Sequence, residues 1–183
     1  MRVVVETPRL ILRELAVEDA DFLVRLLNDP DWLANIGDRG VRSVEDAIEY
    51  LYKWPFPMYE KQLGIWLIVR LEDQVKIGVC GLIKRDGLED VDIGFALLPE
   101  YRGSGYAFEA SEGAIRFGRE TLGLNRIAGI VSPGNRASIR LLEKLGMRYV
   151  GPVVLPNNSE EVSLYRWEKA ASHRSERSGI EKG

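Results

Sequence analysis

The chain has 183 residues, of which 45% are hydrophobic and 29% charged, a balance typical of a globular protein with a substantial core. Its 25 Lys and Arg against 28 Asp and Glu give a net charge of −3, and the charges are interspersed, which argues against nucleic acid as a main partner. No apolar stretch approaches the roughly 18 residues of a membrane-spanning helix, and the first residues lack the pattern of an export signal. We therefore expect a cytoplasmic protein without a membrane partner.

Length and residue usage also predict the domain organisation and restrict the metal chemistry. No linker rich in Pro, Ser or Gly occurs before residue 170, so we expect one domain over residues 1–168 and a polar, disordered tail over residues 169–183. One cysteine, Cys80, and one histidine, His173 in the tail, do not suffice for a Cys/His zinc site, and we expect no metal. Cys80 lies in a β-rich run and is expected to be a small buried residue, not a nucleophile.

The first half of the chain predicts a strand, two helices and then three strands. Alternation of apolar and polar residues over 9–15 indicates a strand, and helical spacing of apolar residues indicates a helix over 17–28. Ser43 and Asp46 resemble a capping box that opens a second helix, which Pro55 terminates. Three β-rich runs separated by turn compositions predict an antiparallel meander, over residues 64–71, 75–84 and 91–97.

The second half alternates helices and strands. From Tyr106 the apolar positions follow a helical period, which predicts a long helix that ends at Gly123. A strand over 126–131, a helix over 135–145 that Asn135 caps, and two strands follow. The two strands are predicted over residues 148–155 and 161–167.

The segment from Leu97 to Ala107 joins a strand directly to the long helix through a glycine-rich turn. The first turn of a helix has unpaired N–H groups and the positive end of the helix dipole, and glycines let a phosphate come close. Arg102 adds a positive charge, but the Walker A pattern is missing and Phe108 replaces the third glycine of a dinucleotide fingerprint. Two interpretations stay open: a site for the diphosphate of another nucleotide-containing ligand, or an ordinary tight turn.

This loop resembles the acyl-CoA loop of the GNAT superfamily of N-acetyltransferases, in which Arg or Gln is followed after two residues by Gly, then by any residue, then by Gly or Ala. Arg102, Gly105 and Ala107 match that pattern. Residues 7–13 and 135–147 resemble the opening strand and the Asn-x-x-Ser-x-x-x-x-Glu-Lys-x-Gly-Phe segment of the RimJ/RimL-like ribosomal-protein alanine acetyltransferase branch. The matches run in order over about residues 7–167.

The resemblance implies an α/β (α+β) GNAT fold, with a central mixed, mostly antiparallel sheet of about seven strands and helices on both faces. It implies that the fourth and fifth strands splay apart around acyl-CoA, and that a bulge in the fourth strand, ending at Leu98-Pro99, frees backbone groups for the pantetheine amides. The residues expected to bind acetyl-CoA are Leu97, Leu98, Arg102, Gly103, Ser104, Gly105, Tyr106, Ala107 and Asn135.

Asp92 is the best candidate for the base that takes the proton of the attacking amine. It shares a strand face with Gly94 and Ala96, which we expect to be a shallow surface open to substrate. A carboxylate beside a hairpin is also common without any catalytic role. Glu14 and Glu100 are weaker candidates for the base.

Ser138 is the candidate for contact with the departing CoA sulfur, because the resemblance places the matching serine of this branch there. As a residue of the first helical turn it is equally consistent with a polar helix surface. Many superfamily members have a tyrosine acid four residues later, where this sequence has Leu142. The departure leaves Ser138, a water or direct release of the thiolate, which needs little protonation because a thiol has a pKa near about 8.5.

Aromatic residues and prolines alternate over residues 54–59, which we expect to form a rigid loop after the second helix. Such a segment commonly just covers the core. In the family the corresponding region borders the acceptor site, so the candidates for acceptor binding are Trp54, Phe56 and Tyr59.

The resemblance implies an acetyl-CoA-dependent N-acetyltransferase whose acceptor is a primary amine, either a protein N-terminus or a small molecule, attacked directly in a ternary complex. The alternative is a non-catalytic acyl-CoA-binding or regulatory module, which the missing tyrosine and the single uncertain base favour. An unrelated nucleotide-binding domain fits the loop poorly. The sequence does not choose the acceptor, nor between a monomer and a homodimer.

Overall fold

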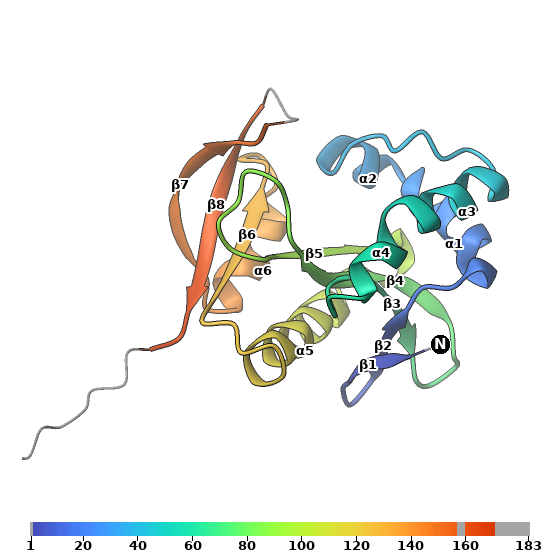
Figure 1. Cartoon of the computed structure of the whole chain (residues 1–183), viewed down its shortest axis with the longest axis horizontal. Helices are drawn as coiled ribbons and strands as arrows, with labels where there is room; N and C mark the ends of the chain where they lie inside the picture. Colours follow the sequence, from blue (N-terminus) through green and yellow to red (C-terminus); the bar gives the residue numbers. More distant parts are fainter. Residues whose placement is uncertain (1, 157–159, 171–183) are drawn as a thin grey trace, which may run out of the picture.

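A computed structural model describes residues 2–156 and 160–170, so the expected polar tail lies outside the described residues beyond residue 170 (Figure 1). Within these residues, eight strands form one sheet in the order β1-β2-β3-β4-β5-β6-β8-β7, and only β5 and β6 run parallel to each other. The strands are β1 (Val3–Glu6), β2 (Leu10–Glu14), β3 (Gly64–Arg70), β4 (Lys76–Ile83), β5 (Asp92–Leu97), β6 (Arg126–Val131), β7 (Arg148–Val154) and β8 (Glu161–Glu168). The sequence predicts seven of them and misses β1, a four-residue strand with no polar residue between its valines.

Helices cover both faces of the sheet, and two of them were not expected. They are α1 (Ala20–Leu27), α2 (Pro30–Asn35), α3 (Val44–Lys53), α4 (Pro55–Tyr59), α5 (Tyr106–Glu120) and α6 (Arg136–Lys144), with 3-10 turns η1 (Val17–Asp19) and η2 (Pro99–Tyr101). The expected aromatic loop is instead the short helix α4, and that expectation was wrong. Pro55 and Pro30 both stand at the start of a helix, where the missing N–H of proline costs no hydrogen bond.

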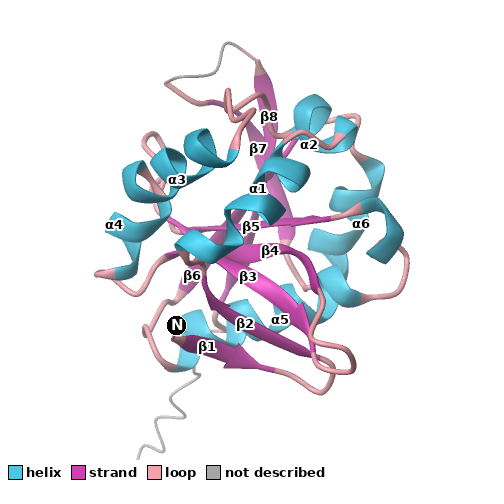
Figure 2. Cartoon of the chain, turned by 90° about the vertical axis from the view of Figure 1, so that its right-hand side faces the viewer, coloured by secondary structure: helices cyan, strands magenta, loops and turns pink. Residues whose placement is uncertain are grey.

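Helices lie on both sides of the sheet (Figure 2), and each face of the sheet carries its own core. One core joins α1–α4 to the sheet and includes Leu23 and Leu67, whereas the other joins α5 and α6 to the sheet and includes Ala114 and Trp66. Consecutive residues of β3 thus point into different cores, as the two-residue period of a strand requires. The observed architecture is the mixed, mostly antiparallel sheet with helices on both faces that the resemblance implies.

The sheet opens between β5 and β6. Asp92 and Ala128 are the one residue pair in register between these strands, and the Ala128 N–H donates to the Val91 carbonyl over 2.8 Å. On its other side β5 pairs with β4 along its whole length without a register shift, so the expected bulge near Leu97 is absent. The splay alone leaves backbone groups without a strand partner. Successive residues of a strand direct their backbone N–H and carbonyl groups to opposite edges of the strand. The backbone groups of Phe95 and Leu97 therefore face the opening toward β6, as those of Val91 do.

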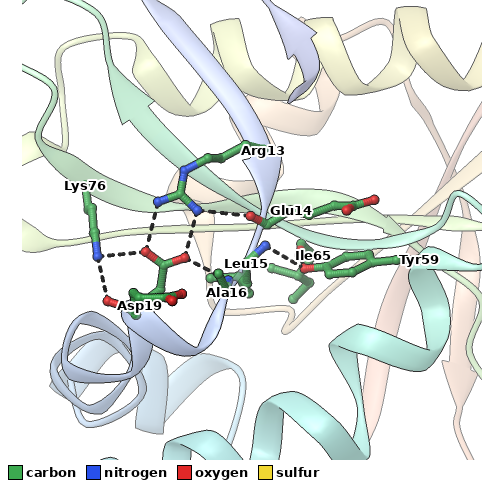
Figure 3. A network of polar contacts seen from close by, with 9 residues as sticks. Arg13, Glu14, Leu15, Ala16, Asp19, Tyr59, Ile65 and Lys76 are labelled. Atoms are coloured by element: carbon green, nitrogen blue, oxygen red, sulfur yellow. Dashed lines mark hydrogen bonds and ion pairs between the residues drawn. The ribbon is translucent and has the colours of Figure 1, made fainter. Parts of the chain in front are cut away.

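The buried carboxylate of Asp19 fastens the turn into α1 to the sheet (Figure 3). Arg13 approaches both of its oxygens, at 2.7 and 2.9 Å, and Lys76 Nζ lies 2.7 Å from Oδ1. The backbone N–H of Ala16 also donates to Oδ2, over 2.9 Å. Burial by itself would raise the pKa of Asp19, but the hydrogen bonds from Arg13, Lys76 and Ala16 outweigh burial and hold the pKa below the ordinary 3.8.

Replacing Asp19 with Asn should lower the free energy of unfolding by about 3 kcal/mol at neutral pH, because Arg13 and Lys76 lose a buried carboxylate partner. A carboxyl group whose pKa is lowered on folding stabilises the protein above its unfolded pKa and ceases to do so as the pH falls through its folded pKa. The difference between the two proteins in urea unfolding should therefore shrink below about pH 4. Asp73→Asn, which breaks an exposed pair with Arg70, is the control and should leave the midpoint unchanged. Equal stability of Asp19→Asn and the wild type would contradict this role.

Candidate active site

The loop between β5 and α5 presents a row of backbone N–H groups without partners. Gly103 and Gly105 have φ angles of 77° and 83°, in the left-handed region that favours glycine, and Gly105 caps α5 without any side-chain bond. Among the described residues, no hydrogen-bond acceptor meets the backbone N–H groups from Gly103 to Phe108. Since residues 103–105 are also exposed, the start of α5 offers several fixed donors and the positive end of a helix dipole to an anion.

Glu109 ties this loop to the beginning of the chain. Its Oε1 accepts from Thr7 Oγ1 at 2.7 Å and from the Arg9 N–H at 2.9 Å, while Arg9 Nε donates to Oε2 at 2.6 Å. Arg9 also donates to the Ser104 carbonyl at 3.1 Å and stacks on the Tyr106 ring at 4.5 Å. These bonds lower the pKa of Glu109 against the opposing effect of burial. Sequence reasoning missed this clamp, although the family resemblance of residues 7–13 marked the segment.

Arg102 does not stand as a free cation at the loop. Its Nε donates to the Leu97 carbonyl over 3.0 Å, and its two terminal nitrogens contact the carboxylates of Asp29 and Asp31. The positive charge that the sequence offers to a phosphate is therefore already paired with two carboxylates in this structure.

Leu97 ends β5, and Leu98 follows it in the chain. The side chains of Leu97 and Leu98 are buried, in the α5 core and the α1–α4 core respectively, so they offer only their backbone to a ligand. The Leu98 N–H already donates to the Ile77 carbonyl over 2.9 Å. Phe95 is half-buried beside the opening, and its backbone together with the Leu97 N–H forms the edge that a ligand can pair with.

Asn135 caps α6 as the sequence predicts. Its Oδ1 accepts from the Ser138 N–H over 3.1 Å, which places Ser138, half-buried, in the first turn of the helix. Leu142, one turn further, is 1% exposed and packs against Gly129, where a Cβ would lie 2.9 Å from Leu142 Cδ2. The position at which many relatives carry a phenol is therefore part of the core in this chain.

Asp92 lies on the expected strand but not on an open surface. It is fully buried at the start of β5, where Arg85 covers it with Nε at 2.9 and 3.1 Å from the two carboxylate oxygens. Its register partner Ile83 belongs to the α1–α4 core, so Asp92 faces that side of the sheet. Burial raises the pKa of Asp92 and Arg85 opposes the rise. The expected exposure was wrong because the side chain that covers Asp92 comes from the turn between β4 and β5.

The two weaker candidates for the base occupy other places. Glu100 is exposed in η2 and pairs with Arg25 of α1. Glu14 stands opposite Trp66 of β3, so it shares the sheet face that α5 covers, whereas Asp92 faces the other helices.

Cys80 is fully buried, as expected. Its sulfur lies 3.8 Å from Ser111 Oγ, and burial raises the pKa of the thiol to about 12. Such a thiol is not a nucleophile at neutral pH.

The aromatic candidates for acceptor binding pack in and beside α4. The Trp54 ring lies 5.7 Å from that of Tyr50, and the Phe56 ring lies 6.2 Å from that of Tyr59. The Tyr59 hydroxyl accepts from the Leu15 N–H at 3.0 Å and donates to the Ile65 carbonyl at 2.6 Å (Figure 3). That hydroxyl is committed to the backbone, and burial raises its pKa, so it has no ready role toward a substrate.

Within residues 2–156 and 160–170, no helix is long and apolar enough to cross a membrane. The same part of the chain holds no group of three His, Cys, Asp or Glu side chains placed to bind a metal ion.

A family model described as an acetyltransferase (GNAT) domain matches residues 9–148. The chain belongs to this GNAT acetyltransferase family. The uncharacterized N-acetyltransferase YoaA of Bacillus subtilis (strain 168) is 31% identical over 150 residues, which cover 81% of this chain and 84% of YoaA.

Solved structures share the fold of this acetyltransferase. An acetyltransferase from Agrobacterium tumefaciens str. C58 has a TM-score of 0.75 and 24% identity, with 92% of this chain and 95% of that chain covered. RimL, a ribosomal-protein alpha-N-acetyltransferase in complex with coenzyme A, has a TM-score of 0.77 and 16% identity, with 91% and 98% covered.

Replacing Gly105 with Val should raise the dissociation constant for CoA at least tenfold, about 1.4 kcal/mol or more, by calorimetry. A β-branched residue is strained at a φ of 83° and places methyl groups in front of the unpaired N–H groups of the GNAT loop. Gly123→Val is the matched control, because Gly123 also has a positive φ, of 67°, but lies past the other end of α5 with open space around it. A folded Gly105→Val protein with unchanged CoA affinity would contradict the assignment of the loop.

Proposed function

We propose that this acetyltransferase transfers the acetyl group of acetyl-CoA to a primary amine, either a protein N-terminal amine or a small-molecule amine. The observation that carries the proposal is the meeting of the open edge of β5 with the unpaired N–H groups at the start of α5. The two lie a few residues apart in the chain and offer amide pairing and anion binding in succession. A pantetheine arm followed by a diphosphate presents the complementary groups in the same succession.

The residues of the site fit acetyl-CoA. The diphosphate would lie on the N–H groups of residues 103–108, and the pantetheine amides would pair with Phe95 and Leu97. The GNAT relatives solved with CoA or acetyl-CoA support the same cosubstrate. Asn135 remains a proposed contact, since its amide nitrogen is not used in the helix cap.

Acetyl-CoA supplies a thioester, whose carbonyl the neutral amine attacks while the CoA thiol leaves. Asp92 would take the proton of the amine, directly or through a water, and its raised pKa makes it a stronger base than an ordinary aspartate. Ser138 would donate a hydrogen bond to the departing sulfur. The next turn of α6 offers no phenol for this role, because the buried Leu142 occupies that position. Trp54 and Phe56 would border the acceptor.

We propose that the chain belongs to the RimJ/RimL-like branch, and the segments at residues 7–13 and 135–147 and the likeness in fold to RimL support this proposal. On this proposal a protein N-terminus is the first acceptor to test. A spermidine N-acetyltransferase also shares the fold, so small amines belong in the same experiment.

The decisive experiment follows free thiol while the protein is incubated with acetyl-CoA and a panel of N-terminal peptides and small amines. Thiol release that depends on one acceptor, with the acetylated product seen by mass spectrometry, would establish the activity and the acceptor class together. Calorimetric binding of acetyl-CoA without turnover on any acceptor would favour the alternative, a non-catalytic acyl-CoA-binding module. The buried Leu142, at the position where many superfamily members have a tyrosine acid, is the observation that favours this alternative.

Ser138→Ala should lower kcat with little change in acetyl-CoA affinity, because a hydrogen bond to sulfur strengthens only as negative charge develops there. Steady-state kinetics and calorimetry measure the two quantities. Ala137→Ser, which adds a hydroxyl at a neighbouring exposed position, serves as the control and should leave kcat unchanged. Equal turnover of Ser138→Ala and the wild type would return Ser138 to an ordinary helix surface.

Asp92→Asn should lower kcat roughly 10²-fold or more and leave CoA binding intact, since the amide keeps the size of the carboxylate and loses its proton affinity. For an alkyl amine, the wild-type kcat/KM should rise with pH toward the pKa of the amine or of the group that deprotonates it.

The control for Asp92→Asn is Asp90→Asn, which removes a nearby carboxylate held by Arg126 and Arg166 at 3.0 and 2.9 Å but not proposed to act on substrate. A near-normal rate in Asp92→Asn would mean that the proton leaves through water. A loss confined to KM would instead show that Asp92 only attracts the cationic amine.

A further inference from the structure

We propose that Arg102 is a positioning residue that couples the acetyl-CoA loop to α2, and that it does not bind the CoA diphosphate itself. The proposal rests on the proposed function, because it concerns how the same site is assembled. It follows from where the guanidinium points and from what its partners do.

The Arg102 side chain is engaged on three sides. Nε holds the Leu97 carbonyl at 3.0 Å, Nη2 holds Asp29 Oδ1 at 2.5 Å, and Nη1 contacts Asp31 Oδ2. One guanidinium therefore faces two carboxylates, which leaves this place with a net negative charge. A diphosphate bound in contact with Arg102 would have to displace these carboxylates or lie against them, and both are unfavourable.

Asp29 links the same guanidinium to the start of α2. It is buried, and its Oδ1 also accepts from the backbone N–H groups of Asp31 and Trp32, at 3.2 and 3.3 Å. A helix of six residues is not stable alone, so α2 depends on this cap and on the burial of Trp32 in the α1–α4 core. Arg102 thus supports the carboxylate that begins α2.

Two further contacts join the loop to the same helices. Arg25 of α1 pairs with Glu100 of η2, and Leu98 is buried in the α1–α4 core. At the other end of the connection, the Leu97 carbonyl that Arg102 holds belongs to the open edge of β5. One guanidinium therefore joins two parts of the proposed site. These are the β5 edge that would pair with pantetheine, and helices α1–α4, which lie on the side of the sheet that Asp92 faces.

This connection predicts that the two substrates influence each other's binding. A ligand that orders the β5 edge and the loop also fixes Arg102 and with it the start of α2. The reverse holds by thermodynamic linkage, so an acceptor bound against α1–α4 should tighten acetyl-CoA binding by the factor by which acetyl-CoA tightens the acceptor.

A double-mutant cycle between Arg102 and Asp29 tests the proposal. Asn is as good an N-cap as Asp, so Asp29→Asn keeps the cap of α2 and removes the charge that Arg102 holds. If Arg102 acts by position, Arg102→Gln and Asp29→Asn should each raise the calorimetric dissociation constant for CoA about five- to tenfold, roughly 1–1.4 kcal/mol, and the double variant should be no weaker than either single variant.

If instead Arg102 binds the diphosphate, the two variants should act in opposite directions. Asp29→Asn would free the guanidinium and tighten CoA binding or leave it unchanged, while Arg102→Gln alone would weaken it. That result would overturn the proposal.

Acetyl-pantetheine, which lacks the diphosphate, supplies the second measurement. Loss of a positioning residue should lower kcat/KM for acetyl-pantetheine and acetyl-CoA by similar factors, and should raise the KM of the acceptor as well. A loss seen with acetyl-CoA only would contradict the coupling of the β5 edge to α2 through Arg102, because acetyl-pantetheine uses that edge without the loop.

Asp38→Asn is the charge-matched control. Asp38 pairs with Arg42 in the exposed segment between α2 and α3 and has no contact with the loop, so CoA affinity should not change. Absence of CoA binding by the wild type would defeat the proposed function itself. Normal CoA binding and thiol release by the wild type, with additive effects in the cycle, would overturn only the coupling through Arg102.

Discussion

The candidate site depends on one constraint, the meeting of β5 and β6 as parallel strands at a single residue pair. Parallel neighbours require a crossover, and α5 provides it after η2 and a short glycine-rich loop. Because the pairing goes no further than Asp92 and Ala128, the rest of β5 has a free edge, and the same chain turns at once into the first N–H groups of α5. Amide-pairing groups and anion-binding groups thus arise from one feature of the topology, in the order in which an acyl-CoA presents its own.

The arginine side chains around this site attach neighbouring elements of the fold to one another. Arg9, Arg85 and Arg102 each pair with a carboxylate from a distant part of the chain or from a neighbouring turn. Such pairs satisfy the carboxylates that lie buried or half-buried beneath the loop and the sheet. Recognition of an anion is then left to backbone N–H groups, which the start of the helix and the left-handed conformation of Gly103 and Gly105 present to the solvent. The N–H groups of the loop are therefore free for an anion, while the charged side chains around it attach neighbouring elements to one another.

Local patterns in the sequence predict most of the fold and only part of the site. Seven strands and four helices follow from periodicity, turns and caps, because these signals act over a few residues. The short elements β1, α2 and α4 escape, since two of them begin at a proline that reads as an end rather than as a start. The contacts of Arg102 with Asp29 and of Arg9 with Glu109 cannot be predicted from local patterns for another reason. Their partners lie 73 and 100 residues away in the chain. Strand alternation identifies the face on which Asp92 lies, but nothing local shows that Arg85 covers it.

The proposed reaction involves two proton transfers, one to the departing thiolate and one from the attacking amine, and the second needs more help from the protein. A thiol with a pKa near about 8.5 leaves readily, so replacing the phenol position with the buried Leu142 removes little that the reaction needs. The amine is more demanding: roughly one alkyl amine in 10³ is neutral at pH 7, against about one in ten for a protein N-terminus with a pKa near 8. A carboxylate base such as Asp92, which Arg85 holds, therefore accelerates the reaction of an alkyl amine far more than that of an N-terminal amine. If the acceptor is a protein N-terminus, as the proposed branch suggests, about a tenth of it is already neutral at pH 7. A base as fully enclosed as Asp92 then needs only to take, through a water, the proton that the new amide bond releases.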